Sequence, residues 1–143
     1  MTVPIINKSK NDYPKYANEG DAGCDLRADL ENPITIRPMS GAVIPTGIYI
    51  AIPMGYEGQV RGRSGLNFKN DIICPVGTVD SGYRGEVKVK LYNLGQIPFT
   101  INPGDRIAQL VFAKVEKAMF VQTDVFTDET ERGEGGFGSS GMK

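Results

Sequence analysis

The stretch EVKVKLY, residues 86–92, is the clearest indication of the fold class of this 143-residue chain. Its apolar side chains, Val87, Val89 and Leu91, alternate with charged side chains at the positions between them. This period of two is typical of a β-strand with one face in the core and the other in water. We therefore expect a strand here that packs one face against the interior.

Short stretches of the same kind occur before and after this strand. They are rich in β-branched or aromatic residues and lie at residues 34–37, 42–44, 47–52, 56–62, 72–74, 99–101, 107–115 and 119–125. Clusters of asparagine, proline and glycine separate them, as at residues 32–33, 45–47, 53–55 and 102–105. One short helix is expected at residues 65–70. Many short strands with turns between them predict an all-β fold: a sandwich, a jelly roll or a small barrel.

The composition restricts the chemistry that this chain can perform. It has 16 Lys and Arg against 17 Asp and Glu, so we expect no basic surface for nucleic acid. Histidine is absent, which excludes Ser-His-Asp and Cys-His catalysis and imidazole metal ligands. The cysteines, Cys24 and Cys74, are too few for a zinc cluster and do not suggest a secreted disulfide framework.

The sequence also carries an expectation about location. No run of apolar residues is long enough to span a membrane, and residues 1–10 lack the apolar segment of a signal peptide. We therefore expect no membrane association and an intracellular protein, cytoplasmic or, in a eukaryote or a virus-infected cell, nuclear.

The end of the chain differs from the rest. We expect one β domain, residues 1–130, followed by a short arm, residues 131–143. The arm holds five glycines, and Arg132 and Phe137 stand among them. A glycine-rich end can be a disordered tail. Alternatively, its guanidinium group and aromatic ring suit a flexible arm that closes over an aromatic, phosphorylated ligand.

Two stretches in the first half combine glycine with charge. In AGCDLRA, residues 22–28, Asp25 is most simply explained by a turn with a structural Asp–Arg pair. In GRSGL, residues 62–66, Arg63, Ser64 and the amide of Gly65 lie at the expected helix start, where they would form a small anion site. The alternative there is an N-cap serine beside a surface arginine.

Two further stretches lie in the second half. VGTVDSGYRGE, residues 76–86, predicts a β-hairpin whose turn holds Asp80 and Tyr83. An aspartate in a turn usually caps that turn, but without histidine a carboxylate is the natural group to activate water. In NPGDRIAQLVF, residues 102–112, Gln109 interrupts an apolar strand and fits either a surface position or a site.

Taken in order and spacing, these stretches resemble the five motifs of the trimeric dUTP diphosphatases (dUTPases). The matches lie at residues 22–28, 62–66, 77–86, 103–112 and 132–141, so the resemblance covers essentially the whole chain. It implies a jelly-roll-like, distorted β-barrel of the dUTPase-like or β-clip type. It also implies a homotrimer with active sites at the subunit interfaces, over which the C-terminal arm of one subunit closes.

The resemblance further implies a reaction and its catalytic group. The reaction would be dUTP + water → dUMP + pyrophosphate, with water attacking the α-phosphorus. It keeps uracil out of DNA and supplies dUMP for dTMP synthesis. Asp80 matches the family's water-activating carboxylate. Asp25 and Gln109 match residues that hold the waters of a bound Mg²⁺, with no direct protein ligand expected.

The remaining matches would bind the substrate. Uracil would be held by backbone groups, at Gly77, Thr78, Val79 and Lys88, and the deoxyribose by the ring of Tyr83. The triphosphate would be held by polar groups of the second and fourth motifs, at Arg63, Ser64, Gly65 and Gln109. The arm would clamp the phosphates and cover the base through Arg132, Phe137 and Gly138.

Two other functions compete with this one. A dCTP deaminase of the same superfamily would need a glutamate on the strand after the hairpin, where this chain has Lys90. A non-catalytic, nucleotide-switched regulatory protein would not need to keep Asp80 and the arm. Cys74 stands where some dUTPases carry an asparagine that reads uracil, so base recognition here would rest on backbone groups.

Overall fold

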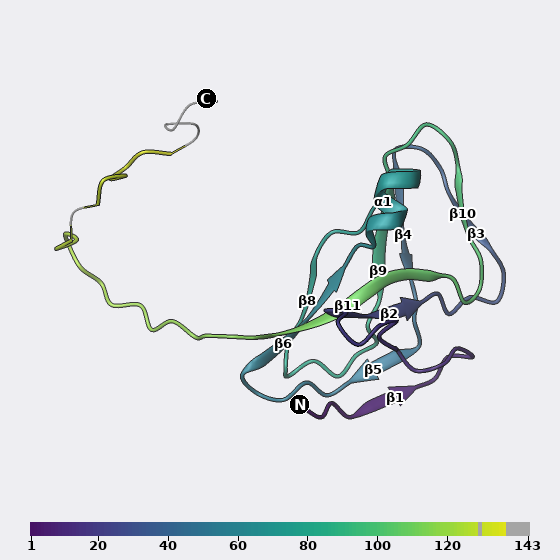
Figure 1. Cartoon of the computed structure of the whole chain (residues 1–143), viewed down its shortest axis with the longest axis horizontal. Helices are drawn as coiled ribbons and strands as arrows, with labels where there is room; N and C mark the ends of the chain where they lie inside the picture. The colour runs from purple at the N-terminus through teal and green to yellow at the C-terminus, as the bar shows by residue number, and fades with distance from the viewer. Residues whose placement is uncertain (129, 137–143) are drawn as a thin grey trace.

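The computed structural model describes residues 1–128 and 130–136 of the chain (Figure 1). Within these ranges the chain is built mainly from short strands with one short helix, which confirms the all-β prediction. The elements are β1 (Ile5–Asn7), β2 (Gly23–Arg27), β3 (Ile34–Ile36), β4 (Ser40–Ile44), β5 (Ile48–Ile50), β6 (Tyr56–Arg61), α1 (Ser64–Asn70), β7 (Ile72–Ile73), β8 (Gly77–Val79), β9 (Val89–Asn93), β10 (Phe99–Ile101) and β11 (Arg106–Lys114).

The described strands form four antiparallel sheets. The largest has the order β2-β11-β6-β8, a second has the order β4-β9-β7, and two pairs, β1-β5 and β10-β3, complete the set. Strand β11 lies inside the largest sheet, where it pairs with β2 on one side and with β6 on the other. In the part of the chain described here the sheets do not close into one barrel. They form a jelly-roll-like arrangement around a shared core.

The core follows from the alternation of residues 86–92. Val87, Val89 and Leu91 are 2%, 0% and 1% exposed, whereas the intervening Lys88 is exposed. Burial of each such side chain contributes about 1.5–3 kcal/mol relative to an exposed position. Isoleucines from β3, β4, β5, β7 and β10 meet these side chains in the same buried cluster. The predicted pattern of one buried and one wet face is confirmed, but the strand begins at Val89, so residues 86–88 belong to the loop before it.

The predicted β-hairpin at residues 76–86 is wrong. Strand β8 pairs with β6, whereas β9 pairs with β4 and β7, so the intervening loop crosses from one sheet to another. The physical cause is backbone hydrogen bonding between β5 and the chain at residues 86–87. Glu86 forms an isolated bridge with Tyr49, and the backbone N–H of Val87 donates to Ile48 O at 2.8 Å.

Two other local expectations also differ from the structure. Residues 22–28 contain strand β2 rather than a turn, because Cys24 and Leu26 alternate into the core. Residues 119–125 form no strand, and Met119 and Phe120 are exposed. Figure 1 shows this segment leaving β11 and running away from the body of the domain. Among the described residues, α1 spans seven residues, and no helix is long and apolar enough to cross a membrane.

Candidate active site

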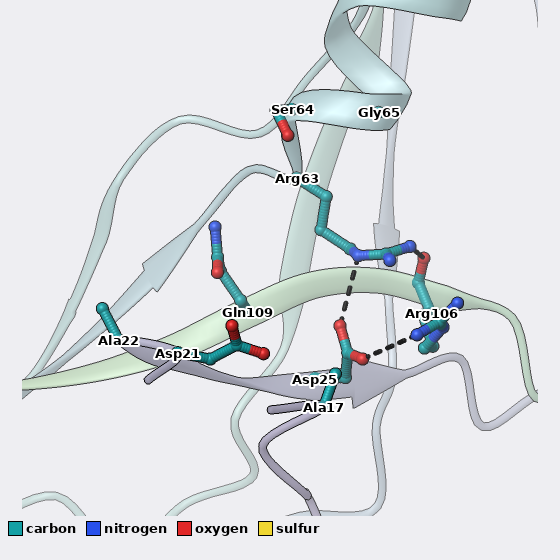
Figure 2. A pocket seen from close by; sticks show the side chains of 10 residues that line it. Ala17, Asp21, Ala22, Asp25, Arg63, Ser64, Gly65, Arg106 and Gln109 are labelled. Atoms are coloured by element: carbon teal, nitrogen blue, oxygen red, sulfur yellow. Dashed lines mark hydrogen bonds and ion pairs between the residues drawn. The ribbon is translucent and has the colours of Figure 1, made fainter. Parts of the chain in front are cut away.

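One cavity, of about 240 Å³, lies where β2, β11 and the start of α1 meet (Figure 2). It gathers residues that are far apart in the sequence. Its lining consists of Ala17, Asp21, Ala22, Gly23, Asp25, Arg63, Ser64, Gly65, Arg106 and Gln109. The structure thus brings together all the predicted site residues of the first, second and fourth motifs. We call this cavity the anion cavity.

Asp25 orients two guanidinium groups in the anion cavity. Its Oδ1 lies 3.2 Å from Nε of Arg63, and its Oδ2 lies 3.1 Å from a terminal nitrogen of Arg106. Figure 2 shows the carboxylate between the two guanidinium groups. Arg63 also donates to the backbone oxygen of Arg106 at 3.0 Å. Since a guanidinium group has five N–H donors, both arginines retain donors for an anion.

The Asp–Arg pair expected within residues 22–28 is wrong, because Asp25 pairs with the distant Arg63 and Arg106. Arg27 instead donates to the backbone oxygen of Gly104 at 2.8 Å. Arg106 is a site residue that the sequence analysis missed. Its one signal in the sequence was its place inside the fourth motif; in the structure it is the first residue of β11, opposite Arg27 on β2.

Gln109 is fixed by its neighbours on both sides. Its Nε2 donates to the backbone oxygen of Gly62 at 2.9 Å, so its Oε1 is left as an acceptor. On the adjacent strand, a Cβ added at Gly23 would lie 2.7 Å from that Oε1. A side chain at residue 23 would therefore displace the Gln109 amide from this position.

Ser64 does not cap the helix. The N-cap residue of α1 is Arg63, and no side chain caps the helix there. The alternative of a capping serine is therefore wrong. Ser64 is exposed and lines the anion cavity, where its hydroxyl is available to a ligand.

A second cavity, of about 250 Å³, surrounds β8 and the loop that follows it. We call it the nucleoside cavity, after the role predicted for its residues. Its lining consists of Val60, Gly77, Thr78, Val79, Asp80, Tyr83, Glu86, Val87 and Lys88. It therefore brings together every predicted residue of the third motif together with Lys88. It shares no lining residue with the anion cavity.

The nucleoside cavity offers backbone hydrogen-bonding groups to a ligand. Strand β8 lies at the edge of its sheet and pairs with β6 on one side only. An edge strand leaves N–H and C=O groups on its outer side for another partner. Asp80 and Tyr83 follow in a turn closed by a 3.0 Å hydrogen bond from Tyr83 N–H to Asp80 O. Both side chains are exposed.

Cys74 lies close to this region but is not a reactive group. It lines neither cavity, and burial raises the pKa of its thiol to about 11. Burial also raises the pKa of Cys24. Both side chains are thus neutral thiols near pH 7, whereas a nucleophile must be a thiolate.

Among the arm residues that the structure describes, residues 131–136, none lines either cavity. Arg132 lies in a turn, and its Nε donates to the backbone oxygen of Gly135 at 2.8 Å. Figure 1 shows this part of the chain apart from the strands that hold the two cavities. Phe137 and Gly138, the other predicted arm residues, lie outside the residues that the structure describes.

The fold and its cavities define a β protein equipped to bind a phosphorylated nucleoside. A family model, dUTPase, matches residues 9–141. The chain belongs to the dUTPase family.

Curated relatives are similar in sequence to this chain over almost its whole length. The chain is 52% identical over 143 residues to the deoxyuridine 5'-triphosphate nucleotidohydrolase of Finegoldia magna, with 99% of each chain covered. It is also 52% identical over 136 residues to the same enzyme from Chlamydia trachomatis serovar D, with 94% of each covered. The predicted family membership is confirmed.

Solved structures agree with the fold. The dUTPase of Staphylococcus bacteriophage 80alpha with dUpNHpp has a TM-score of 0.87 at 30% identity, with 98% of each chain covered. A mutant dUTPase from phage phi11 of S. aureus, described with a structural Mg(II) ion, has a TM-score of 0.80 at 25% identity. That likeness covers 88% of this chain and 99% of the phage chain. The dUTPase-like, jelly-roll-like fold is confirmed.

Proposed function

We propose that this protein, a dUTP diphosphatase by family, hydrolyses dUTP to dUMP and pyrophosphate across its two cavities. The observation that carries the proposal is their complementary chemistry. One cavity presents Arg63, Arg106 and Ser64 to an anion, and the other presents strand-edge backbone, Asp80 and Tyr83 to a nucleoside. The activity keeps uracil out of DNA and supplies dUMP. Because dUTP is made and used inside cells, we place the protein there.

Asp80 is the proposed general base. It is exposed and lines the nucleoside cavity, directly after the strand that would hold the base. The chain contains no histidine, so a carboxylate is the natural group to take a proton from water. Proton transfer to Asp80 would accompany attack of that water on the α-phosphorus, with pyrophosphate as leaving group.

The nucleoside cavity would select the base and the sugar. The outer edge of β8, at Gly77, Thr78 and Val79, would hydrogen-bond uracil together with the backbone of Lys88. A backbone edge has a fixed order of donors and acceptors and little spare volume, which disfavours cytosine and the 5-methyl group of thymine. The ring of Tyr83 would pack under the deoxyribose, where a ribose hydroxyl would clash.

The anion cavity would hold the triphosphate. Arg63 and Arg106 present oriented guanidinium groups, which suit phosphate oxygens. Ser64, the amide of Gly65 and Gln109 would complete the set of polar partners. These groups would bind the phosphates in one geometry and so set the α-phosphorus in line with the attacking water.

The charges of the anion cavity fit a role for Mg²⁺. Two arginines lining it are balanced by Asp21 and Asp25, so the protein supplies little net positive charge for a triphosphate. Mg²⁺ keeps several waters and readily takes phosphate oxygens, and it would supply the missing neutralisation when bound. Asp25 and Gln109 would hold its waters rather than the ion itself, because Asp25 already pairs with two guanidinium groups.

A homotrimer would unite the two cavities. Their linings share no residue on one chain, and in a trimer the anion cavity of one subunit would face the nucleoside cavity of a neighbour. The segment after β11 supports association, since Met119, Phe120 and Val121 are 88%, 94% and 77% exposed. Exposed apolar runs of this kind mark protein–protein contacts. Arg132, Phe137 and Gly138 would then close over a site formed by neighbouring subunits.

The test is pyrophosphate release with Mg²⁺ across dUTP, dTTP, dCTP, UTP and dATP. We expect strong selectivity for dUTP, with UTP rejected at the sugar and dTTP at the base. Ammonia release from dCTP would instead support the deaminase, which the family and the curated relatives do not favour. A folded protein that binds dUTP without turnover would support the regulatory alternative.

A further inference from the structure

The loop from Asp80 to Lys88 carries most of the nucleoside cavity, yet it joins two different sheets. Strand β8 before it pairs with β6, and β9 after it pairs with β4 and β7. Neither sheet by itself fixes the positions of Asp80, Tyr83 and Lys88 relative to one another. Contacts within the loop and to a third element must therefore supply that rigidity.

Within the loop, Tyr83 is held against the backbone of Glu86. Its hydroxyl donates to the backbone oxygen of Glu86 at 3.0 Å. The ring folds back over Gly85, where an added Cβ would overlap the Tyr83 hydroxyl. The position of the tyrosine ring thus depends on where Glu86 is held.

The Glu86 side chain reaches across to the turn between β4 and β5. Its Oε1 accepts hydrogen bonds from the backbone N–H of Thr46 at 3.1 Å and of Gly47 at 2.9 Å. The side chain is only 16% exposed, and its Oε2 lies 3.6 Å from Nζ of Lys88. Hydrogen bonds to a charged acceptor are about twice as strong as neutral ones. One carboxylate therefore joins the turn, the loop and Lys88.

We propose that Glu86 is a positioning residue for sugar and base selection in the nucleoside cavity. By holding the loop on the β4–β5 turn, its carboxylate helps to fix the Glu86 backbone, to which the Tyr83 hydroxyl donates and which leads directly to Lys88. The inference rests on the proposed roles of Tyr83 and Lys88. Glu86 itself does not touch the reacting atoms and leaves the proton transfer to Asp80.

The test is steady-state kinetics of the Glu86→Ala enzyme with dUTP and UTP. Loss of the carboxylate removes the side-chain anchor of the loop and leaves the backbone contacts of Glu86 and Val87 to β5. The Tyr83 ring is then held less firmly, so we expect KM for dUTP to rise about tenfold, equivalent to about 1.4 kcal/mol. We expect kcat to stay within about threefold, since Asp80 is retained. The ratio of kcat/KM for dUTP over UTP should fall about tenfold, because a displaced ring no longer excludes the ribose hydroxyl.

Two variants separate positioning from loss of stability. Glu86→Gln keeps an oxygen that can accept from Thr46 and Gly47, so it should retain most of the dUTP over UTP ratio even if Glu86→Ala folds poorly. Ile101→Val truncates a buried side chain in β10, in a different sheet. It should lower Tm while leaving KM and the substrate ratio unchanged.

Tyr83→Ala separates this inference from the proposed function. If Tyr83→Ala loses sugar selection while Glu86→Ala and Glu86→Gln keep wild-type KM and substrate ratio, the role of Glu86 is overturned. If Tyr83→Ala also leaves sugar selection intact, the assignment of the nucleoside cavity fails and the inference fails with it.

Discussion

Asp80 and Asp25 both contribute carboxylates to the proposed site, but their different surroundings suit them to different roles. Asp25 lies between two guanidinium groups and is committed to orienting them. Asp80 is exposed at the end of β8, and its backbone rather than its side chain closes the following turn. Among the described residues no ion pair engages Asp80, so its carboxylate is the better proton acceptor, which supports the assignment of the base to Asp80.

At this position we expect Asp80→Asn to lower kcat by about 10²–10⁴-fold, the usual contribution of a general base. The amide keeps the shape of the side chain but cannot accept the proton. Affinity for a non-hydrolysable dUTP analogue should stay within about tenfold, because the binding groups are retained. Glu31→Gln, at an exposed position outside both cavities, is the matched control. Near-normal kcat in Asp80→Asn would remove Asp80 from this role.

At the scale of elements, the sequence predicted strands well where one face is buried. The alternation at residues 86–92 and the strands around β4, β6, β10 and β11 all have periodic apolar side chains that meet the core. Pairing partners were harder to predict. The hairpin expectation failed because β5 captures the chain at Glu86 and Val87, a long-range contact that local turn residues do not encode.

The site was predictable to a similar extent. Asp25, Arg63 and Gln109 were found from their motifs, and the strand register then places Gln109 opposite Asp25. Arg106 was missed because an arginine next to a turn has no distinctive pattern of its own. Its place in the site depends on its ion pair with Asp25 between the neighbouring strands β11 and β2, a proximity that only the fold determines.

A further prediction concerns the arm, residues 131–143. Deletion of residues 131–143 should leave the strands and both cavities intact, since these residues line neither cavity among the described residues. If the arm closes over the site, activity with dUTP should fall about hundredfold or more, while Tm changes little. Arg132→Ala in the full-length chain should give a smaller loss of the same kind. Wild-type turnover by the deleted protein would exclude a closing arm.

At the scale of the whole molecule, the separation of the two cavities predicts complementation between inactive chains. Arg63→Ala disables the anion cavity and Asp80→Asn the nucleoside cavity, so each homotrimer should be inactive. In trimers assembled from equal amounts of both chains, about a quarter of the sites would combine two intact cavities, given a heterologous interface that closes into a ring. We expect turnover to recover toward that fraction after joint refolding.

Separately refolded and then briefly mixed chains are the control, because they should not exchange subunits before the assay. Native mass measurement of the mixture would verify that mixed trimers have formed. Mixed trimers without recovered turnover would show that each chain carries a complete site, which would contradict the shared-site arrangement.

The outer edge of β8 has a consequence for how the enzyme can evolve. Where a base is read by main-chain groups, a codon change alters the reading atoms only if it introduces proline, since every other residue presents the same N–H and C=O. Substitutions at positions such as Thr78 would alter local shape while keeping the hydrogen-bonding pattern. Random substitutions in β8 would thus rarely change the preference for uracil. A change of preference to another pyrimidine would need a different backbone path in this strand rather than one new side chain.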